Sequence, residues 1–392
     1  MCDQPAERSV PELTALLNQA AEREIRQAPH EWFWVHRRWK TPSPKFLLRS
    51  YRRGVHLPPE IPLKPFRLVV RSPNWLGDAV MAVPAVNAIR AGRPDAHVTV
   101  LGPEKLADLW RTVPGVDAFL GISSGESVWA TAARLRGGFD AAIVLPNSIR
   151  SALEPWLARV PRRVGFAGKW RRTLLNQIVP DPRRIGPPRH QGRRYLDIAA
   201  RIGADLRDAS FGIPPTAPPP DEVRIGLCPG AEYGAAKRWL PERFAEVVRT
   251  VSARRSCQWK IFGTAADSPG ARTICATAQD GVEDLTGRTT LAELIAGLRQ
   301  CRLLLTNDTG TMHLAAWLGV PVVALFGSTE PDLTGPLGAG HTVIRHRAEC
   351  SPCFLRTCPI DFRCMRAITA DEVVEAVLRI LDAPGIESAR TA

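Results

Sequence analysis

Hydroxyl, amide and ionisable side chains follow a buried apolar run in the segment "LLLTNDTGTMHLAAWLGVPVVALFG" (303–327). Loops at the carboxyl ends of parallel strands are where α/β folds bind ligands, and a helix that begins there offers free N–H groups to an anion. Thr309, Thr311 and the nearby backbone N–H groups suit phosphate oxygens, and Gly310 lets a ligand approach closely. The segment therefore predicts a phosphate-binding turn between a strand and a helix.

Two ionisable side chains flank this turn. Asp308 would repel a phosphate, so a functional role for it lies with a sugar hydroxyl; taken alone, it is more simply an N-cap. His313 is either a diphosphate contact or a hydrogen-bonded histidine on a packed helix face, and the residues do not separate the two.

Two further segments place candidate side chains at strand ends. "IGLCPGAEYGAAKRW" (225–239) brings Lys237 near the end of a strand, although an isolated lysine is more often solvated. "LVVRSPNWLGDAV" (68–80) begins a helix at Asp78. That aspartate is either a favourable charge at the helix start or a general base for an acceptor hydroxyl.

Several common catalytic signatures are absent from the sequence. It contains no G-x-x-x-x-G-K-[ST] loop, no G-x-G-x-x-G after the first strand of either half, and no Asp-x-Asp pair. Fixed cations and a helix terminus must then neutralise a departing phosphate, and no metal is predicted. The string Gly121-Ile122-Ser123-Ser124-Gly125 has nucleophile-elbow spacing, but such short matches are common by chance and a serine hydrolase is not favoured.

The elements that position these residues alternate along the chain. Strand patterns at 67–71, 97–102 and 140–146 surround a helix from about 78 to 91, and a second series follows "GIPPTAPPPD" (212–221). This second series has strands at 223–230, 259–264, 303–308 and 321–327, and a last helix capped by Thr369 and Glu372. Alternation of this kind predicts parallel sheets, and the proline-rich segment 213–221 predicts a linker. We expect two doubly wound domains, at 66–212 and 222–392, with one substrate bound by each.

Composition limits the class of protein. The chain has 392 residues, 45% of them hydrophobic, and a net charge of +13. No apolar run reaches the length of about 20 residues that a membrane span needs, and the first residues lack a signal-peptide pattern. Nine scattered cysteines favour a reducing cytosol over a disulfide framework.

The positive charge is concentrated in one stretch. Between Asn147 and Tyr195, twelve Arg and Lys residues face two acidic residues. Such a run is often only a solvated face, but this density favours a polyanionic partner. Because no RNA-binding signature or zinc-finger spacing accompanies the arginines, nucleic acid is not predicted.

The segment "CSPCFLRTCPIDFRC" (350–364) brings Cys350, Cys353, Cys358 and Cys364 together. Four thiolates so close could hold a structural zinc. The pairs lack the usual long intervening loop, so a thiol-rich structural loop is favoured, and the question stays open.

The motifs together resemble the lipopolysaccharide heptosyltransferases of glycosyltransferase family 9, in particular their heptosyltransferase II branch. The resemblance covers roughly residues 66–385 and rests on five motifs in order: "PNWLGDAVMAVPAV", "CPGAEYGAAKRWLPERFAEV", "LTGRTTLAELIAGL", "NDTGTMHLAAWLGVPVVALFGSTEP" and "CSPCFLRTCP". It implies an α/β GT-B fold of two Rossmann-like domains. It also implies an inverting, metal-independent transfer of heptose from ADP-L-glycero-β-D-manno-heptose to heptosyl-Kdo2-lipid A, at the cytoplasmic face of the inner membrane.

The resemblance also implies residue roles. Asp78 matches the family's catalytic base, and Lys237 matches the lysine that meets the donor phosphate. Asp308 matches the aspartate near the heptose, and the remaining donor-binding residues match the diphosphate turn: Thr309, Gly310, Thr311 and His313. Because the acceptor is an anionic glycolipid, we expect it to contact Asn74, Arg162, Arg163, Lys169, Arg171 and Arg172.

The first 65 residues depart from that family. "APHEWFWVHRRWK" (28–40) resembles the C-terminal tail of the acyltransferases that acylate lipid A. The acyltransferase His-x4-Asp is absent from this segment, so acyl transfer is not predicted. An interfacial membrane contact through Trp32, Trp34, Trp39 and the nearby arginines is one interpretation of it.

Two alternatives to this function remain at this stage. The chain could transfer another core sugar, or it could be a catalytically inactive glycolipid-binding protein of the same fold. Turnover of ADP-heptose separates an enzyme from the latter.

Overall fold

The structure is a computed structural model that describes residues 9–27, 65–168, 170–181, 188–207, 211–212, 222–277 and 281–383. The chain divides into two units, Met1–Lys64 and Pro65–Ala392. In the first unit the described element is α1 (Val10–Gln27), which buries none of its residues. The predicted contacts of Trp32, Trp34 and Trp39 and the predicted linker at 213–221 lie outside the described residues.

The second unit contains two six-stranded parallel sheets with the same strand order. The first has the order β3-β2-β1-β4-β5-β6, and the second β12-β11-β10-β7-β8-β9. Counted from its own first strand, each sheet has the order 3-2-1-4-5-6 of the dinucleotide-binding fold. The chain thus folds into two Rossmann-like α/β halves, which confirms the predicted fold class.

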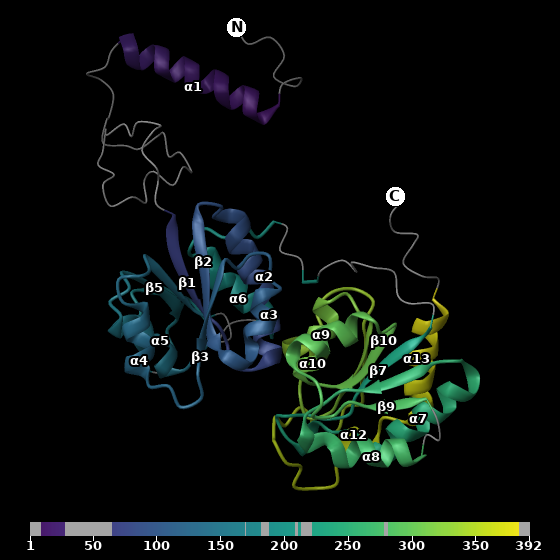
Figure 1. The fold of residues 1–392 in the computed structure, drawn as a ribbon. Helices are drawn as coiled ribbons and strands as arrows, with labels where there is room; N and C mark the ends of the chain where they lie inside the picture. Colours follow the sequence, from purple (N-terminus) through teal and green to yellow (C-terminus); the bar gives the residue numbers. More distant parts are fainter. Residues whose placement is uncertain are drawn as a thin grey trace. The chain divides into compact units, whose positions relative to one another are not determined.

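The first half is built from short buried strands and the helices between them (Figure 1). Its elements are β1 (Phe66–Arg71), α2 (Leu76–Gly92), β2 (Ala96–Pro103), η3 (Glu104–Leu106), α3 (Ala107–Arg111), β3 (Ala118–Ile122), α4 (Val128–Leu135), β4 (Ala141–Val144), α5 (Ile149–Leu157), β5 (Arg162–Phe166), β6 (Gln177–Val179) and α6 (Gln191–Ala200). Figure 1 shows α4 and α5 on one side of this sheet and α2, α3 and α6 on the other.

The second half repeats the arrangement. Its elements are β7 (Arg224–Cys228), η5 (Ala235–Lys237), α7 (Pro241–Arg254), β8 (Gln258–Ile261), η6 (Ala265–Asp267), α8 (Ser268–Thr277), β9 (Val282–Asp284), α9 (Leu291–Arg299), β10 (Leu303–Asn307), α10 (Gly310–Trp317), β11 (Val322–Phe326), α11 (Pro331–Thr334), β12 (Thr342–Arg345), α12 (Arg363–Arg366) and α13 (Ala370–Asp382). None of the helices in the described ranges is long and apolar enough to cross a bilayer.

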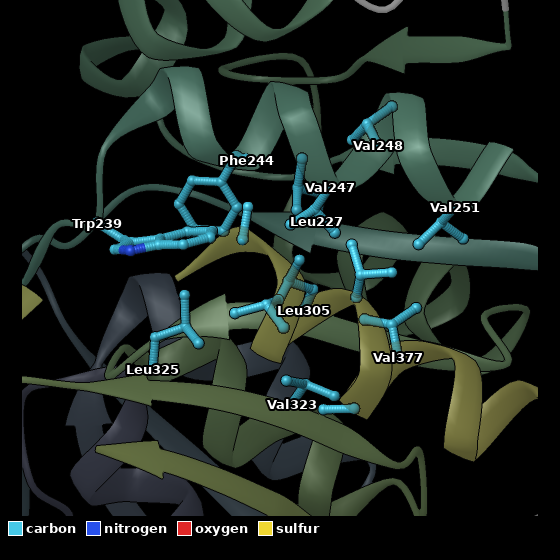
Figure 2. Packing of buried hydrophobic residues seen from close by; sticks show 14 of the residues in the cluster. Leu227, Trp239, Phe244, Val247, Val248, Val251, Leu305, Val323, Leu325 and Val377 are labelled. Atoms are coloured by element: carbon cyan, nitrogen blue, oxygen red, sulfur yellow. The ribbon is translucent and has the colours of Figure 1, made fainter. Parts of the chain in front are cut away.

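The core of the second half lies between its sheet and α7 and α13. Figure 2 shows Phe244 and three valines of α7 over Leu227, Leu305 and Leu325 of the strands. The Trp239 and Phe244 rings meet edge to face, with centroids 4.9 Å apart. The indole N–H of Trp239 donates to the Ile368 carbonyl at 3.2 Å, which satisfies its one polar group inside this apolar cluster.

The N-terminal cap of α13 differs in detail from the sequence prediction. Thr369 does cap α13, since its hydroxyl accepts from the Glu372 N–H at 3.3 Å. The Glu372 carboxylate accepts from His346 Nε2 at 2.7 Å. The capping box is therefore only half formed among the described residues, because a tertiary partner takes its acid.

Helices α2 and α10 are apolar on nearly every face. Ten residues of α2 and six of the eight residues of α10 are buried. Besides its sheet, α2 packs against α6 and α10. A helix buried on all sides needs no polar face, which explains why both helices lack an amphipathic pattern.

Candidate active site

The site is built from the loops that leave the central strands of each sheet. In an open α/β sheet ligands bind outside the carboxyl ends of the strands, at the point where the strand order reverses. Here that point lies between β1 and β4 in the first half and between β7 and β10 in the second. Asp78 follows β1, Lys237 follows β7 and Asp308 follows β10, so all three lie where the fold predicts a ligand.

Lys237 and Asp308 form an ion pair. The Lys237 ammonium lies 2.5 Å from Asp308 Oδ2, and the two side chains are 13% and 5% exposed. Thr329, which follows β11, donates its hydroxyl to the same oxygen at 2.7 Å. The sequence predicted a functional role for both charges but not their pairing, and it gave no indication of Thr329.

Asn307 holds the two loops together. This last residue of β10 is fully buried. Its side-chain oxygen accepts from the Trp239 N–H at 3.1 Å, and its Nδ2 donates to the Pro229 carbonyl at 2.7 Å. Both bonds go to the loop that carries Lys237, so Asn307 fixes that loop against the strand that carries Asp308.

The turn predicted to bind phosphate is the N-terminus of α10. Thr309 is its N-cap, and the Thr309 hydroxyl accepts from the Met312 N–H at 3.4 Å. Thr309, Gly310 and Thr311 are partly exposed, so a ligand can reach this turn. The pKa of His313 is lowered to about 4, chiefly by burial; the Asp308 charge raises it, and the charges of His190 and Lys237 lower it. His313 is thus neutral near pH 7 and can contact a diphosphate only as a hydrogen-bonding group.

Gly77 and Gly310 bring α2 and α10 into close contact. A Cβ on Gly77 would lie 2.9 Å from His313 Cδ2 and 3.3 Å from Gly310 Cα, and a Cβ on Gly310 would lie 3.0 Å from Leu76 Cβ. The missing side chain of Gly310 therefore makes room for α2. Its close approach to a ligand, which the sequence predicted, remains a prediction.

We expect Gly77→Ala to disturb this helix contact. The added methyl must displace His313, and overpacking of this kind costs about 1–3 kcal/mol. The midpoint of urea unfolding should fall accordingly. Gly270→Ala is the matched control, since a Cβ there meets only Pro241 Cγ at 3.8 Å. Equal unfolding midpoints for the two variants would show that the α2–α10 contact is looser than described.

Asp78 lies in the first turn of α2, beside Tyr195 of α6. The Tyr195 hydroxyl donates to Asp78 Oδ1 at 3.4 Å. Burial raises the pKa of the Asp78 carboxyl, the Tyr195 hydrogen bond and the Lys237 charge lower it, and the Asp308 charge raises it. Burial also holds the pKa of Tyr195 well above its usual value, so this phenol stays protonated. Asp78 is therefore a partly buried carboxylate whose pKa responds to the charges of Lys237 and Asp308.

A cavity of about 600 Å³ opens at the carboxyl ends of the first sheet's strands. It is lined by Arg71, Asn74, Trp75, Pro103, Glu104, Lys105, Ile122, Ser123, Ser124, Ser148 and Arg150. Of the acceptor residues expected from the sequence, Asn74 is in this lining. Arg71 and Arg150, which do line it, were not singled out, and both pair with the buried Glu154 of α5, at 2.7 and 3.1 Å.

Two of the predicted acceptor residues lie elsewhere. Arg162 and Arg163 open β5, beside Ala141 and Ala142 at the amino end of β4, so they are at the opposite edge of the sheet from Asp78. The Arg162 guanidinium donates to Gln177, and that of Arg163 to the carbonyls of Leu174 and Val160. We therefore correct the prediction and leave both arginines out of the acceptor site.

The other predicted arginines differ from one another. Arg171 is fully buried, its Nη1 donates to Asn147 Oδ1 at 3.2 Å, and burial lowers its pKa to about 10. It supports the loop from inside and is not free to meet an acceptor, whereas Arg172 is exposed and available. Lys169 lies outside the described residues.

The cysteine segment 350–364 supports the Lys237 loop. The Tyr233 hydroxyl donates to the Phe354 carbonyl at 2.9 Å, and the Ala236 N–H donates to the Arg356 carbonyl at 3.0 Å. Cys350, Cys353, Cys358 and Cys364 are free thiols. Within the described ranges no three His, Cys, Asp or Glu side chains are grouped so that they could hold a metal ion. What the structure shows for this segment is its backbone contacts with the loop that carries Lys237.

Comparisons with known proteins agree with this architecture. Residues 128–362 match the family described as "Glycosyltransferase family 9 (heptosyltransferase)", and residues 1–41 match "Bacterial lipid A biosynthesis acyltransferase". Both resemblances expected from the sequence are thereby confirmed.

Individual relatives cover most of the chain. The chain is 30% identical to lipopolysaccharide heptosyltransferase 2 of Escherichia coli K12 over 308 residues, which are 71% of this chain and 88% of that protein. It is 31% identical to the Salmonella typhimurium protein of the same name, with the same coverage. The solved structure of E. coli ADP-heptose LPS heptosyltransferase II superposes with a TM-score of 0.67 and 28% identity, over 81% of this chain and 98% of that one.

Proposed function

This chain belongs to glycosyltransferase family 9, the heptosyltransferases, and from that premise we propose that it moves heptose from ADP-heptose to the heptosyl-Kdo2-lipid A inner core of lipopolysaccharide. The observation that carries the proposal is the position of Asp78 close to the Lys237–Asp308 pair, at the strand ends where two Rossmann-like halves bind ligands. A base so placed can act on the attacking hydroxyl of the acceptor, and a cation so placed can stabilise the leaving diphosphate of the donor.

Asp78 acts on the acceptor in this proposal. Its carboxylate takes the proton from an acceptor hydroxyl as the oxygen attacks the anomeric carbon of the heptose. The bond from that carbon to the diphosphate oxygen breaks on the opposite side, so the anomeric configuration inverts. The protonated Tyr195 beside Asp78 orients the carboxylate through its hydrogen bond.

The second half stabilises the leaving ADP. The Lys237 ammonium and the free N–H groups at the start of α10 supply positive charge where negative charge develops on the diphosphate. Asp308, which is held by Lys237 and Thr329, accepts from a heptose hydroxyl. This division explains why a carboxylate lies beside a phosphate turn.

Acceptor-dependent release of ADP from ADP-heptose tests the proposal. We expect release when a soluble inner-core fragment is added and little release without it. Equal release in both cases would mean hydrolysis, and no release in either would mean that the chain only binds its ligands.

Turnover should depend on the ionised form of Asp78. Burial raises the pKa of this carboxyl above its usual value of about 3.9, so the active carboxylate is lost at a higher pH than an ordinary aspartate would allow. As pH falls through this raised pKa, kcat/KM should decline. A pH profile of kcat/KM between about pH 4 and pH 9 measures it. A flat profile down to the usual aspartate range would argue against Asp78 as the base.

We further propose that the reaction needs no divalent metal. Lys237 and the α10 N-terminus provide the charge that a metal would otherwise supply. Turnover should persist in excess chelator, measured by ADP release after prolonged incubation with it. Activity that vanishes with chelator and returns with added magnesium would contradict this role of Lys237.

The proposed acceptor is anchored in a bilayer by its lipid A. We therefore propose that the enzyme works as a peripheral protein at the cytoplasmic face of the inner membrane. Its net charge of +13 supports attraction to the anionic lipids and phosphorylated glycolipids of such a surface.

A further inference from the structure

A second cavity, of about 550 Å³, lies on the α4–α5 side of the first sheet. Two tryptophans, a leucine and three arginines line it: Trp129, Arg136, Trp156, Leu157, Arg159 and Arg163. None of these residues lines the cavity of about 600 Å³ at the strand ends. The lining contains no acidic side chain, and the proposed reaction leaves this cavity without a role.

The tryptophans of this cavity are unusually exposed for their size. Trp129, in the first turn of α4, is 67% exposed, and Trp156, near the end of α5, is 43% exposed. An indole ring is a large apolar body with one N–H donor, and it prefers the boundary between water and an apolar phase. Two such rings on one side of a sheet favour a partner that offers this boundary.

The arginines add uncompensated positive charge. Arg136 and Arg159 are exposed at the ends of α4 and α5. Arg159 has a φ of 58°, a left-handed conformation in which glycine would be unstrained. Arg163 is fixed by hydrogen bonds from its guanidinium to two backbone carbonyls, so its side chain is held in place at the cavity wall.

The acidic residues of the same two helices and their caps are engaged elsewhere. Glu154 of α5 is buried and paired with Arg71 and Arg150. Glu126, just before α4, pairs with Arg134. The cations that line the cavity therefore meet solvent without a neutralising carboxylate in its lining, which suits an anionic partner.

We propose that this α4–α5 face, defined by the six residues that line the cavity, docks the chain on an anionic lipid bilayer. Exposed tryptophan beside arginine is the combination that binds a membrane interface, with the ring at the headgroup level and the cation on a lipid phosphate. The inference rests on the proposed function for its partner, because the proposed acceptor is itself lipid-anchored.

One helix links this face to the cavity of about 600 Å³ at the strand ends. That cavity is lined by Ser148 and Arg150, at the start of α5, and by Ser124, in the loop before α4. Helix α5 thus contributes to both cavities, through Arg150 near its start and through Trp156 and Leu157 near its end. Docking through the end of α5 would leave its start, and the 600 Å³ cavity there, open to the acceptor's sugars.

Flotation of the full chain with vesicles tests the inference. Three double variants are compared with the wild type: Trp129→Ala with Trp156→Ala, Arg136→Glu with Arg159→Glu, and the control Arg249→Glu with Arg272→Glu. The control pair makes the same change in net charge at exposed positions of α7 and α8. Vesicles are either pure phosphatidylcholine or an equal mixture with phosphatidylglycerol.

We expect both face variants to lower the partition coefficient on the anionic vesicles at least about tenfold, and the control to change it far less. The arginine variant should also lose most of the salt dependence, while the tryptophan variant should keep it. Each variant should release ADP with a soluble acceptor fragment at about the wild-type rate.

Three results would overturn the inference. The face variants could float with the vesicles as the wild type does. They could lose turnover on the soluble fragment in proportion to vesicle binding, which would assign the cavity to the acceptor's sugars. The wild type could bind a single-stranded oligonucleotide through these residues and ignore vesicles. A wild type that docks through this face but releases no ADP would leave the docking intact and refute the proposed reaction.

Discussion

Replacing Asp78 with asparagine should lower kcat by about two to four decades, the size of effect expected when a general base is removed. Asparagine keeps the volume of the side chain and can still accept from Tyr195, so α2 and its contacts should persist. The affinity for the donor should stay nearly unchanged, because the base acts on the acceptor hydroxyl. Steady-state ADP release and calorimetric binding of ADP measure the two quantities.

Asp108→Asn provides the matched control for this experiment. Asp108 lies on α3 and forms a surface pair with Arg111 at 3.5 Å, away from the proposed chemistry. It should retain wild-type turnover. Survival of turnover in Asp78→Asn would show that another group takes the proton.

Replacing Lys237 with methionine should lower kcat/KM by about two to three decades, as removal of one electrostatic stabiliser of a developing anion does. It also leaves the buried Asp308 carboxylate without its cation, which should lower the free energy of unfolding by about 3–5 kcal/mol. A loss of activity could then reflect damage to the structure. Thermal unfolding and ADP release are therefore measured on the same preparations.

The double variant Lys237→Met with Asp308→Asn separates the two effects. It removes both charges, and the amide can still accept from Thr329, so stability should return toward the wild-type value. Turnover should stay low because the leaving diphosphate still lacks its cation. Recovery of turnover together with stability would mean that Lys237 serves only to neutralise Asp308.

The central strands of both sheets could be predicted from the sequence because of their burial. Strands of a parallel sheet are covered on both faces and read as continuous apolar runs, as β10 and β11 do. Five strands of the described sheets were not predicted from the sequence: β3, β5, β6, β9 and β12. The residues of β3 are all partly exposed, and β5 begins with two arginines. The local sequence does not identify these strands, and they are recognised only by their pairing with neighbouring strands in the sheet.

The loops that carry the site could be predicted, but the pairing of their side chains could not. Asp308 and Lys237 are 71 positions apart, and Tyr195 and Asp78 are 117 apart. Nothing in the local pattern of either segment indicates its partner. Asn307 and Thr329 have the same limitation, because their roles depend on which strands become neighbours in the sheet.

The number of basic residues in the stretch could be counted from the sequence, but where each arginine side chain lies in the fold could not be predicted. Arg163 bonds backbone carbonyls at the wrong edge of the sheet for the acceptor, Arg171 is buried, and Arg150 faces the cavity. The outcome for each arginine depends on the strand or helix that carries it. Charge density alone therefore does not identify the contact residues, and the polyanionic partner of this stretch stays a prediction.

The mass of a soluble inner-core acceptor after incubation with ADP-heptose tests the central claim most directly. Two fragments are compared, one that ends in Kdo and one that carries the first heptose on Kdo. We expect the heptosylated fragment to gain one heptose with an inverted anomeric bond, and the Kdo fragment to gain none. If the heptosylated fragment gains no heptose, or if only the Kdo fragment does, the account given for this chain is wrong.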